Sequence, residues 1–116
     1  YRFDLASVLI QMEQYREAIP ELQQAKSNPH IRNKALLLLG TCFSKLGMND
    51  LAINAYGDAV KELSTFTNEK KELLYELGLI YEKVGRKDDY LNCMKEIYNN
   101  DYGYRDVATR VESSYQ

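Results

Sequence analysis

The sequence predicts an all-α protein of three helical hairpins followed by a closing helix. Three observations indicate this fold. An apolar pattern with helical spacing recurs three times along the 116 residues, and a glycine divides the second and third copies into two halves. After the third copy the pattern changes to a segment with one apolar and one charged face. Together these observations predict seven helices and no strands.

The repeat is clearest in its second and third copies. The shared residues at matching positions are Leu36, Leu39, Gly40 and Phe43 in the second copy, and Leu74, Leu77, Gly78 and Tyr81 in the third. The pattern also extends back to Leu5, Ala6 and Leu9, at a period of about 34 residues. The second and third copies are further apart than this period, so about four residues near Thr65 to Lys70 are extra.

Each copy has the residues of a helical hairpin. In the second copy Gly47 can adopt the left-handed conformation that ends the first helix, and Asn49 or Asp50 can cap the second. Small residues such as Gly40 and Ala52 would let the two helices approach closely. Each copy therefore predicts a pair of antiparallel helices.

Other polar and proline residues indicate where helices begin. Asn28 and Pro29 are predicted to be the cap and first-turn proline of the second copy's first helix. The third hairpin is predicted to start near Thr67 or Asn68, with Gly85 between its helices.

A closing helix is predicted after the third hairpin, with Asp101 as its cap. Its apolar face comprises Tyr104, Val107, Ala108, Val111 and Tyr115. One apolar and one charged face suit the end of a stack of repeats. The predicted organisation is a single domain, 1–116, with repeats at about 1–32, 33–66 and 71–102 and the closing helix at about 103–115.

Composition and charge exclude several function classes. The 15 Lys and Arg residues against 17 Asp and Glu give a net charge of -2, without the basic excess of a nucleic-acid-binding protein. The longest apolar run, Ala35 to Leu39, is far shorter than the roughly 20 residues that span a bilayer. No basic start followed by an apolar stretch indicates a signal peptide, and the termini do not locate the parent protein. Its location is left open, with the cytoplasm favoured. The chain begins at Tyr1 without Met and is expected to be a piece of a longer protein.

The reactive side chains indicate neither an enzyme nor a cofactor-binding protein. The single His30 and the isolated Cys42 and Cys93 do not form a metal-ligand cluster or a disulfide framework. A Ser-His-Asp catalytic set would have to use His30, the single histidine, and that residue is expected at a helix start. Cys42 is expected in the core and Cys93 at a surface or half-buried position. We predict no enzymatic activity, no metal and no cofactor.

The repeat period, with Leu-Gly-x-x-aromatic in the first helix and Ala-x-x-x-aromatic in the second, resembles the tetratricopeptide repeat (TPR) family. The resemblance extends to about Tyr102, and the closing segment resembles that of bacterial TPR proteins. Leu36 and Leu74 stand where the family often has Trp, and Tyr90 replaces a small residue. The resemblance implies a right-handed α-solenoid with a C-terminal capping helix, whose concave groove binds a peptide or protein.

The resemblance also implies which residues line that groove. The implied positions are Phe3, Ser7, Ile10, Lys34, Leu37, Thr41, Lys45, Tyr75, Leu79 and Lys83. Phe3, Leu37 and Tyr75 occupy equivalent places and are expected to form one apolar strip facing away from the hairpin cores. The carboxylate clamp of some TPR domains is disfavoured, because Ser7 and Thr41 replace its Asn residues and Glu72 replaces a Lys.

Two functions follow from this interpretation. The first is a protein–protein interaction module that holds a peptide or protein in the groove, as part of a larger scaffold or assembly protein. The alternative is a structural element that stacks within a longer repeat array or self-associates, without a peptide ligand of its own. The alternative is favoured by the start of the first repeat, where no cap precedes Phe3.

Overall fold

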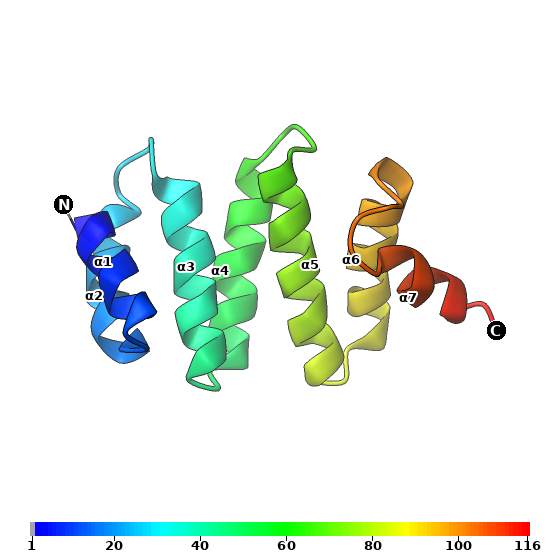
Figure 1. The fold of residues 1–116 in the computed structure, drawn as a ribbon, viewed down its shortest axis with the longest axis horizontal. Helices are drawn as coiled ribbons and strands as arrows, with labels where there is room; N and C mark the ends of the chain where they lie inside the picture. The colour runs from blue at the N-terminus through cyan, green and yellow to red at the C-terminus, as the bar shows by residue number, and fades with distance from the viewer. Residues whose placement is uncertain (1) are drawn as a thin grey trace. The chain divides into compact units, whose positions relative to one another are not determined.

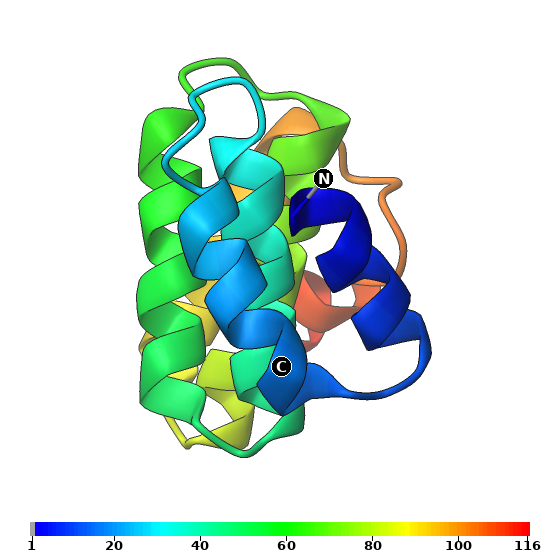
Figure 2. The same ribbon diagram turned by 90° about the vertical axis from the view of Figure 1, so that its left-hand side faces the viewer.

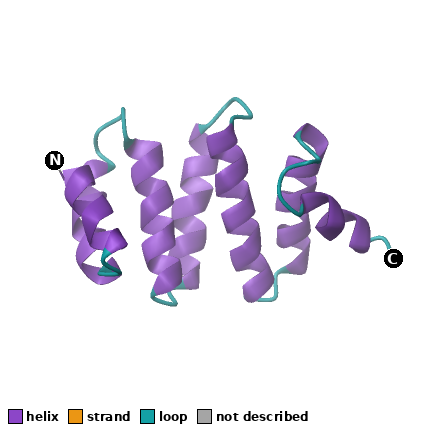
Figure 3. Cartoon of the chain, viewed as in Figure 1, coloured by secondary structure: helices purple, strands orange, loops and turns teal. Residues whose placement is uncertain are grey.

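The computed structural model describes residues 2–116, with the side chain of Arg2 and all of Tyr1 outside the described part. Seven helices and no strand occur in this part of the chain (Figure 3). The helices are α1 (Arg2–Gln11), α2 (Tyr15–Ala25), α3 (Arg32–Lys45), α4 (Asn49–Glu62), α5 (Asn68–Lys83), α6 (Lys87–Asn100) and α7 (Val107–Ser113) (Figure 1). The predicted all-α fold of three hairpins and a closing helix is confirmed.

The described chain forms two compact units. Unit 1 extends to Glu62 and contains α1 to α4, whereas unit 2 begins at Leu63 and contains α5 to α7. The prediction that residues 1–116 act as a single domain stays a prediction.

Unit 1 consists of two hairpins joined through α2. Helix α1 packs against α2, α3 packs against α4, and α2 also packs against α3 (Figure 2). The core of this unit includes small and aliphatic residues that are fully buried, for example Ala18, Leu22, Ala35 and Ala52. Small residues on facing helices allow the close packing that the repeat pattern predicts.

Gly40 is a point of very close packing between α3 and α4. A Cβ atom on Gly40 would lie 2.5 Å from the ring of Tyr56, which is itself buried. The matching position in unit 2, Gly78, faces Met94, whose terminal methyl would lie 2.8 Å from an added Cβ. In both hairpins the glycine makes room for a large side chain of the second helix.

The turns within all three hairpins have the same geometry. Their left-handed residues are Glu13, Gly47 and Gly85, with φ of 58°, 80° and 84°. In each turn the N–H of the next residue donates to a carbonyl five residues back, at 2.8 Å for Gln14 to Leu9, Met48 to Phe43 and Arg86 to Tyr81. This is the Schellman pattern that ends a helix. Glu13 therefore adopts a conformation that two glycines adopt elsewhere.

Some helix starts agree with the sequence and others do not. Thr67 caps α5, its hydroxyl accepting a hydrogen bond from the N–H of Lys70 at 3.2 Å. The predicted start of α3 at Pro29 is wrong, because the side chain of Asn28 accepts a hydrogen bond from the N–H of His30 at 3.0 Å. That turn keeps the chain out of the helix until Arg32.

The predicted start of the closing helix is also wrong. Asp101 is the C-cap of α6, and a turn follows in which the N–H of Tyr104 donates to the carbonyl of Asp101. Helix α7 begins only at Val107, which is fully buried. Tyr115 was assigned to the apolar face, but it lies beyond the helix and is exposed.

Candidate functional site

The predicted groove residues of unit 1 lie on α1 and α3. Half-buried side chains are Phe3, Ser7, Ile10, Leu37 and Thr41, whereas Lys34 and Lys45 are exposed. Neither lysine makes an ion pair within the described part of the chain. On α3, therefore, an accessible apolar residue lies between two cations that are free to meet acidic groups.

The hydroxyl groups of this surface bond within the protein. Ser7 donates to the carbonyl of Phe3 at 3.1 Å, and Thr41 donates to the carbonyl of Leu37 at the same distance. The Thr41 oxygen also lies 3.0 Å from the hydroxyl of buried Tyr56. Thr41 thus connects the surface of α3 to the core of its hairpin.

Tyr75, on α5 in unit 2, is buried rather than open to a groove. Only 7% of its surface is exposed. Its hydroxyl donates to Oδ1 of Asp106 at 2.6 Å, and its ring lies edge-on to Tyr104 at 6.1 Å between centroids. The guanidinium of Arg105 lies 4.9 Å above the same ring. Tyr75 was expected on an apolar strip that faces away from the hairpin cores, and the turn before α7 covers its ring there.

The Tyr75–Asp106 hydrogen bond is supported electrostatically. The pKa of Tyr75 is raised first by burial and second by its hydrogen bond to Asp106. The pKa of the Asp106 carboxyl is lowered, chiefly by the hydrogen bond that it accepts from Tyr75 and further by Arg110. A charged carboxylate therefore accepts the tyrosine hydrogen at neutral pH.

Arg110 connects α7 to both other helices of unit 2. It donates to Asp106 on its own segment at 3.0 Å, to Glu82 of α5 at 3.2 Å and to the hydroxyl of Tyr90 on α6 at 3.1 Å. From the sequence alone, Arg110 belongs only to the charged face of the closing helix. The pairing joins residues 20 and 28 positions apart, so no local pattern could have indicated it.

The remaining groove candidates of unit 2 are Leu79 and Lys83. Leu79 is half-buried and Lys83 is exposed at the end of α5. Lys83 makes no ion pair within the described residues. Together they leave a small accessible surface on α5 beyond the covered Tyr75.

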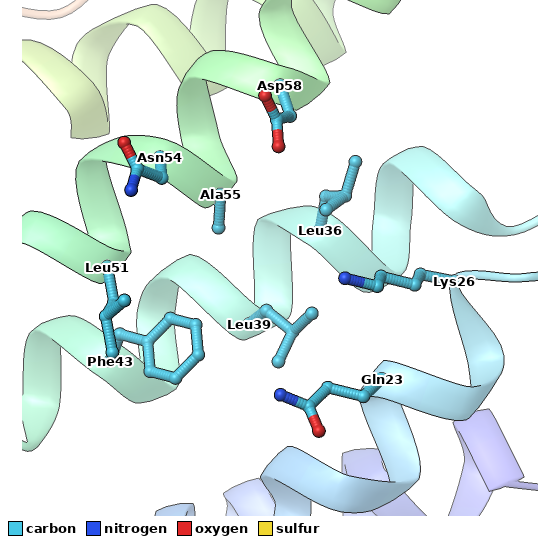
Figure 4. Close-up of a pocket in the computed structure, with 9 residues that line it drawn as sticks. All are labelled: Gln23, Lys26, Leu36, Leu39, Phe43, Leu51, Asn54, Ala55 and Asp58. Carbon is cyan, nitrogen blue, oxygen red and sulfur yellow. The ribbon is translucent and has the colours of Figure 1, made fainter.

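A pocket that the sequence analysis missed lies in unit 1 between α2, α3 and α4 (Figure 4). Its volume is about 140 Å³. The floor comes from Leu36, Leu39 and Phe43 of α3 with Ala55 of α4. The rim comprises Gln23 of α2, its C-cap residue Lys26, and Leu51, Asn54 and Asp58 of α4. The floor residues belong to the apolar stripe of the hairpin, so their pattern indicated only burial.

Both cysteines are buried. Burial raises the pKa of Cys42 to about 11, and burial followed by nearby Glu96 and Asp89 raises that of Cys93 to about 12. Both thiols are therefore protonated at neutral pH and are weak nucleophiles. The expectation for Cys42 agrees with the structure, whereas Cys93 is more buried than expected.

Two features are absent from the described residues. Among them, no three His, Cys, Asp or Glu side chains lie together as a metal-binding group. No helix of residues 2–116 combines the length and apolar character needed to cross a membrane.

Comparison with known proteins agrees with the hairpin geometry. Residues 1–28 and residues 34–62 each match the tetratricopeptide repeat. The two matches correspond to the hairpins α1–α2 and α3–α4 of unit 1. The chain belongs to the tetratricopeptide repeat family. TPR repeats are protein–protein interaction modules. Membership of the family therefore indicates that this chain is an interaction module, without naming its partner.

A curated relative is similar across most of the TPR chain. The response regulator aspartate phosphatase E of Bacillus subtilis (strain 168) is 25% identical over 113 residues, covering 90% of this chain. The chain spans only 30% of that protein's length. The likeness therefore concerns a part of the relative.

Proposed function

We propose that unit 1 binds a protein or peptide partner on the surface formed by α1 and α3. The observation that carries this proposal is Leu37, an accessible apolar residue with Lys34 and Lys45 unpaired on the same helix. Phe3, Ser7 and Ile10 of α1 and Thr41 of α3 complete the proposed surface. A partner that fits it presents an apolar side chain with acidic residues nearby.

In unit 2 the proposed contact residues are Leu79 and Lys83. Tyr75 is not among them, because its ring is covered by Arg105 and its hydroxyl bonds to Asp106. We assign no catalytic step and no cofactor to the chain, and we propose that it serves a larger scaffold or assembly protein. The phosphatase name belongs to a relative of which the chain spans a minor part.

The proposal is tested by placing a benzophenone cross-linker at Leu37 in the source organism. The matched control places the same group at Lys61, an exposed residue of α4. We expect a specific cross-linked protein from Leu37 that Lys61 does not give. The purified partner should then lose more than tenfold in affinity for the Leu37→Ala variant. Equal cross-linking from both positions, or unchanged affinity, would contradict the proposal.

A second function, stacking or self-association, is favoured by an observation on α1. Val8 is 49% exposed. Its repeat equivalent, Cys42, lies on α3, which packs against α2, and is 0% exposed. Met12, one turn further, is 58% exposed. At about 100° per residue, the apolar residues of α1 spread over more than half of its circumference, whereas Asp4, Ser7 and Gln11 share the remaining arc. This apolar face is wider than the stripe of roughly 100° that a helix needs for one packed side. The apolar residues of α1 are Phe3, Leu5, Ala6, Val8, Leu9 and Ile10.

The stacking proposal is tested by the oligomeric state. Light scattering at increasing protein concentration should show association of the wild-type chain and a monomer for Val8→Lys with Met12→Lys. The control pair is Asn92→Lys with Thr109→Lys, both exposed in unit 2. A wild-type chain that remains monomeric at high concentration would leave the interaction-module function as the better account.

A further inference from the structure

The pocket of unit 1 lies on the other side of α3 from the surface proposed above. Successive residues of an α-helix are about 100° apart, so Leu36, Leu39 and Phe43 are turned by roughly 100–160° from Leu37 and Thr41. The pocket lies over that second side, between α2 and α4 (Figure 4). Any ligand bound there would leave Leu37 accessible.

The size of the pocket limits what can occupy it. Its volume of about 140 Å³ is below the range of roughly 300–1,000 Å³ that is usual for small-molecule sites. It has room for about four or five water molecules at roughly 30 Å³ each. Leu36, Leu39 and Ala55 on its floor are buried and offer those waters no hydrogen bonds. The space and the floor fit one large apolar side chain of a partner.

The polar side-chain groups on the rim of the pocket are not bonded to other groups of unit 1. The side chains of Gln23, Asn54 and Asp58 make no hydrogen bond or ion pair within the described residues, and the ammonium group of Lys26 is likewise unpaired there. Figure 4 shows Lys26 and Asp58 on either side of Leu36 at one end of the pocket. Phe43 and Leu51 lie at the other end, which is therefore apolar.

We propose that this pocket is a second docking site, which binds an amphipathic helix of a partner protein through one large apolar side chain. In a partner helix bound between α2 and α4, residues i+3 and i+4 lie one turn beyond residue i along the helix axis, one to each side of residue i around that axis. With an apolar residue i in the pocket, those two residues reach the charged end. One is acidic and meets Lys26, and the other is basic and meets Asp58.

The test uses two synthetic alanine-based helical peptides, each with one leucine and a fluorescent label. One carries Glu at i+3 and Lys at i+4 from the leucine, and the other carries the reverse order. Because the charges lie at one end of the pocket, the direction of binding is determined and the two orders are not equivalent. Exposed ion pairs predict a preference of roughly threefold to tenfold for one order by fluorescence anisotropy.

The variant Lys26→Glu with Asp58→Lys should reverse that preference. A reversal supports the proposal, because a general loss of affinity cannot produce it. Absence of measurable binding by both peptides, equal binding of the two orders, or an unreversed preference would overturn it.

A second variant, Ala55→Leu, fills the pocket without changing its charge and should weaken the preferred peptide by more than tenfold. Lys61→Leu places the same side chain on α4 outside the pocket and should bind within twofold of wild type. If thermal unfolding shows that the Ala55→Leu variant is not folded, the variant Lys26→Glu with Asp58→Lys alone tests the proposal. Leu37→Ala should leave peptide binding unchanged, so this inference and the proposed function fail separately.

Discussion

Glu13 and Gly47 occupy the same left-handed turn position in the first and second hairpins. Their φ angles are 58° and 80°, and the hydrogen bonds that close the two turns have equal lengths of 2.8 Å. A residue with a Cβ loses about 1–2 kcal/mol in this conformation. The first hairpin therefore folds into a turn whose geometry its own residue disfavours.

Replacing Glu13 should stabilise unit 1. Glu13→Gly removes the steric cost but adds chain entropy to the unfolded state, so we expect a gain of about 0.5–1 kcal/mol in the free energy of unfolding. Urea denaturation followed by circular dichroism measures it. The converse variant Gly47→Glu should lose about 1 kcal/mol. A destabilised Glu13→Gly protein would show that the Glu13 side chain contributes more than its conformation costs.

The two repeat glycines should respond differently to alanine. Gly40→Ala places a Cβ 2.5 Å from the ring of Tyr56, and this overpacking should cost about 1–3 kcal/mol. Gly78→Ala meets the terminal methyl of Met94 at 2.8 Å, which can rotate away, and the Cβ of Cys93 at 3.2 Å, which requires a small shift of α6. The better helix propensity of Ala offsets part of that cost. We therefore expect a change within about 1 kcal/mol for Gly78→Ala. Equal loss in both variants would mean that Tyr56 and Met94 are equally rigid.

Tyr75→Phe tests the hydrogen bond that holds the turn before α7. The substitution keeps the ring between Tyr104 and Arg105 but removes the donor to the Asp106 carboxylate. Hydrogen bonds to charged groups contribute about 1.5–3 kcal/mol, and partial exposure of Asp106 places our expectation near 1–2 kcal/mol. Tyr102→Phe, at an exposed tyrosine, is the control and should change stability by less than about 0.5 kcal/mol. Chemical denaturation of both variants measures the difference.

Asp106 should also make unit 2 sensitive to acid. Its folded-state pKa is lowered, so the unfolded chain takes up a proton more readily than the folded chain. The stabilisation is complete above the pKa of the unfolded carboxyl, about 3.9, and is lost as the pH falls through the lower folded value. We expect Asp106→Asn to be less stable than wild type at pH 7 and to lose less stability between pH 5 and pH 2. Parallel acid profiles of the two proteins would exclude this role.

Alanine substitutions of Leu37 and Leu39 should differ in their effect on stability, because Leu37 lies at the surface of α3 and Leu39 in the core. Leu39 is buried, and Leu39→Ala should cost about 2–5 kcal/mol in the free energy of unfolding. Leu37 is half-buried, so Leu37→Ala should cost less than half as much. Thermal unfolding of both variants provides the comparison. A Leu37→Ala protein as unstable as Leu39→Ala would assign Leu37 to the core and remove it from the proposed binding surface.

The sequence by itself determined the hairpins and their turns. Helical spacing and the positions of Gly47 and Gly85 depend on contacts within about four residues, which a repeat pattern records directly. The same reasoning failed at Pro29 and Asp101, because a side chain that can cap a helix can also close the turn before it. Groove positions such as Leu37 followed from the family resemblance, which identifies helix faces.

Only the tertiary structure decided which of those faces are covered. Tyr75 and Leu37 are equivalent in the repeat, yet Asp106, 31 residues beyond Tyr75, bonds to its hydroxyl and the turn before α7 buries its ring. Val8 and Cys42 are likewise equivalent in the repeat. Cys42 is buried because its helix, α3, packs against both α2 and α4, whereas Val8 is exposed because α1 packs against α2. The pocket beside Ala55 arises where three helices fail to fill the space between them. Burial depends on neighbours distant in the chain, whereas periodicity depends on neighbours within a turn, and so the repeat pattern alone could not distinguish these residues.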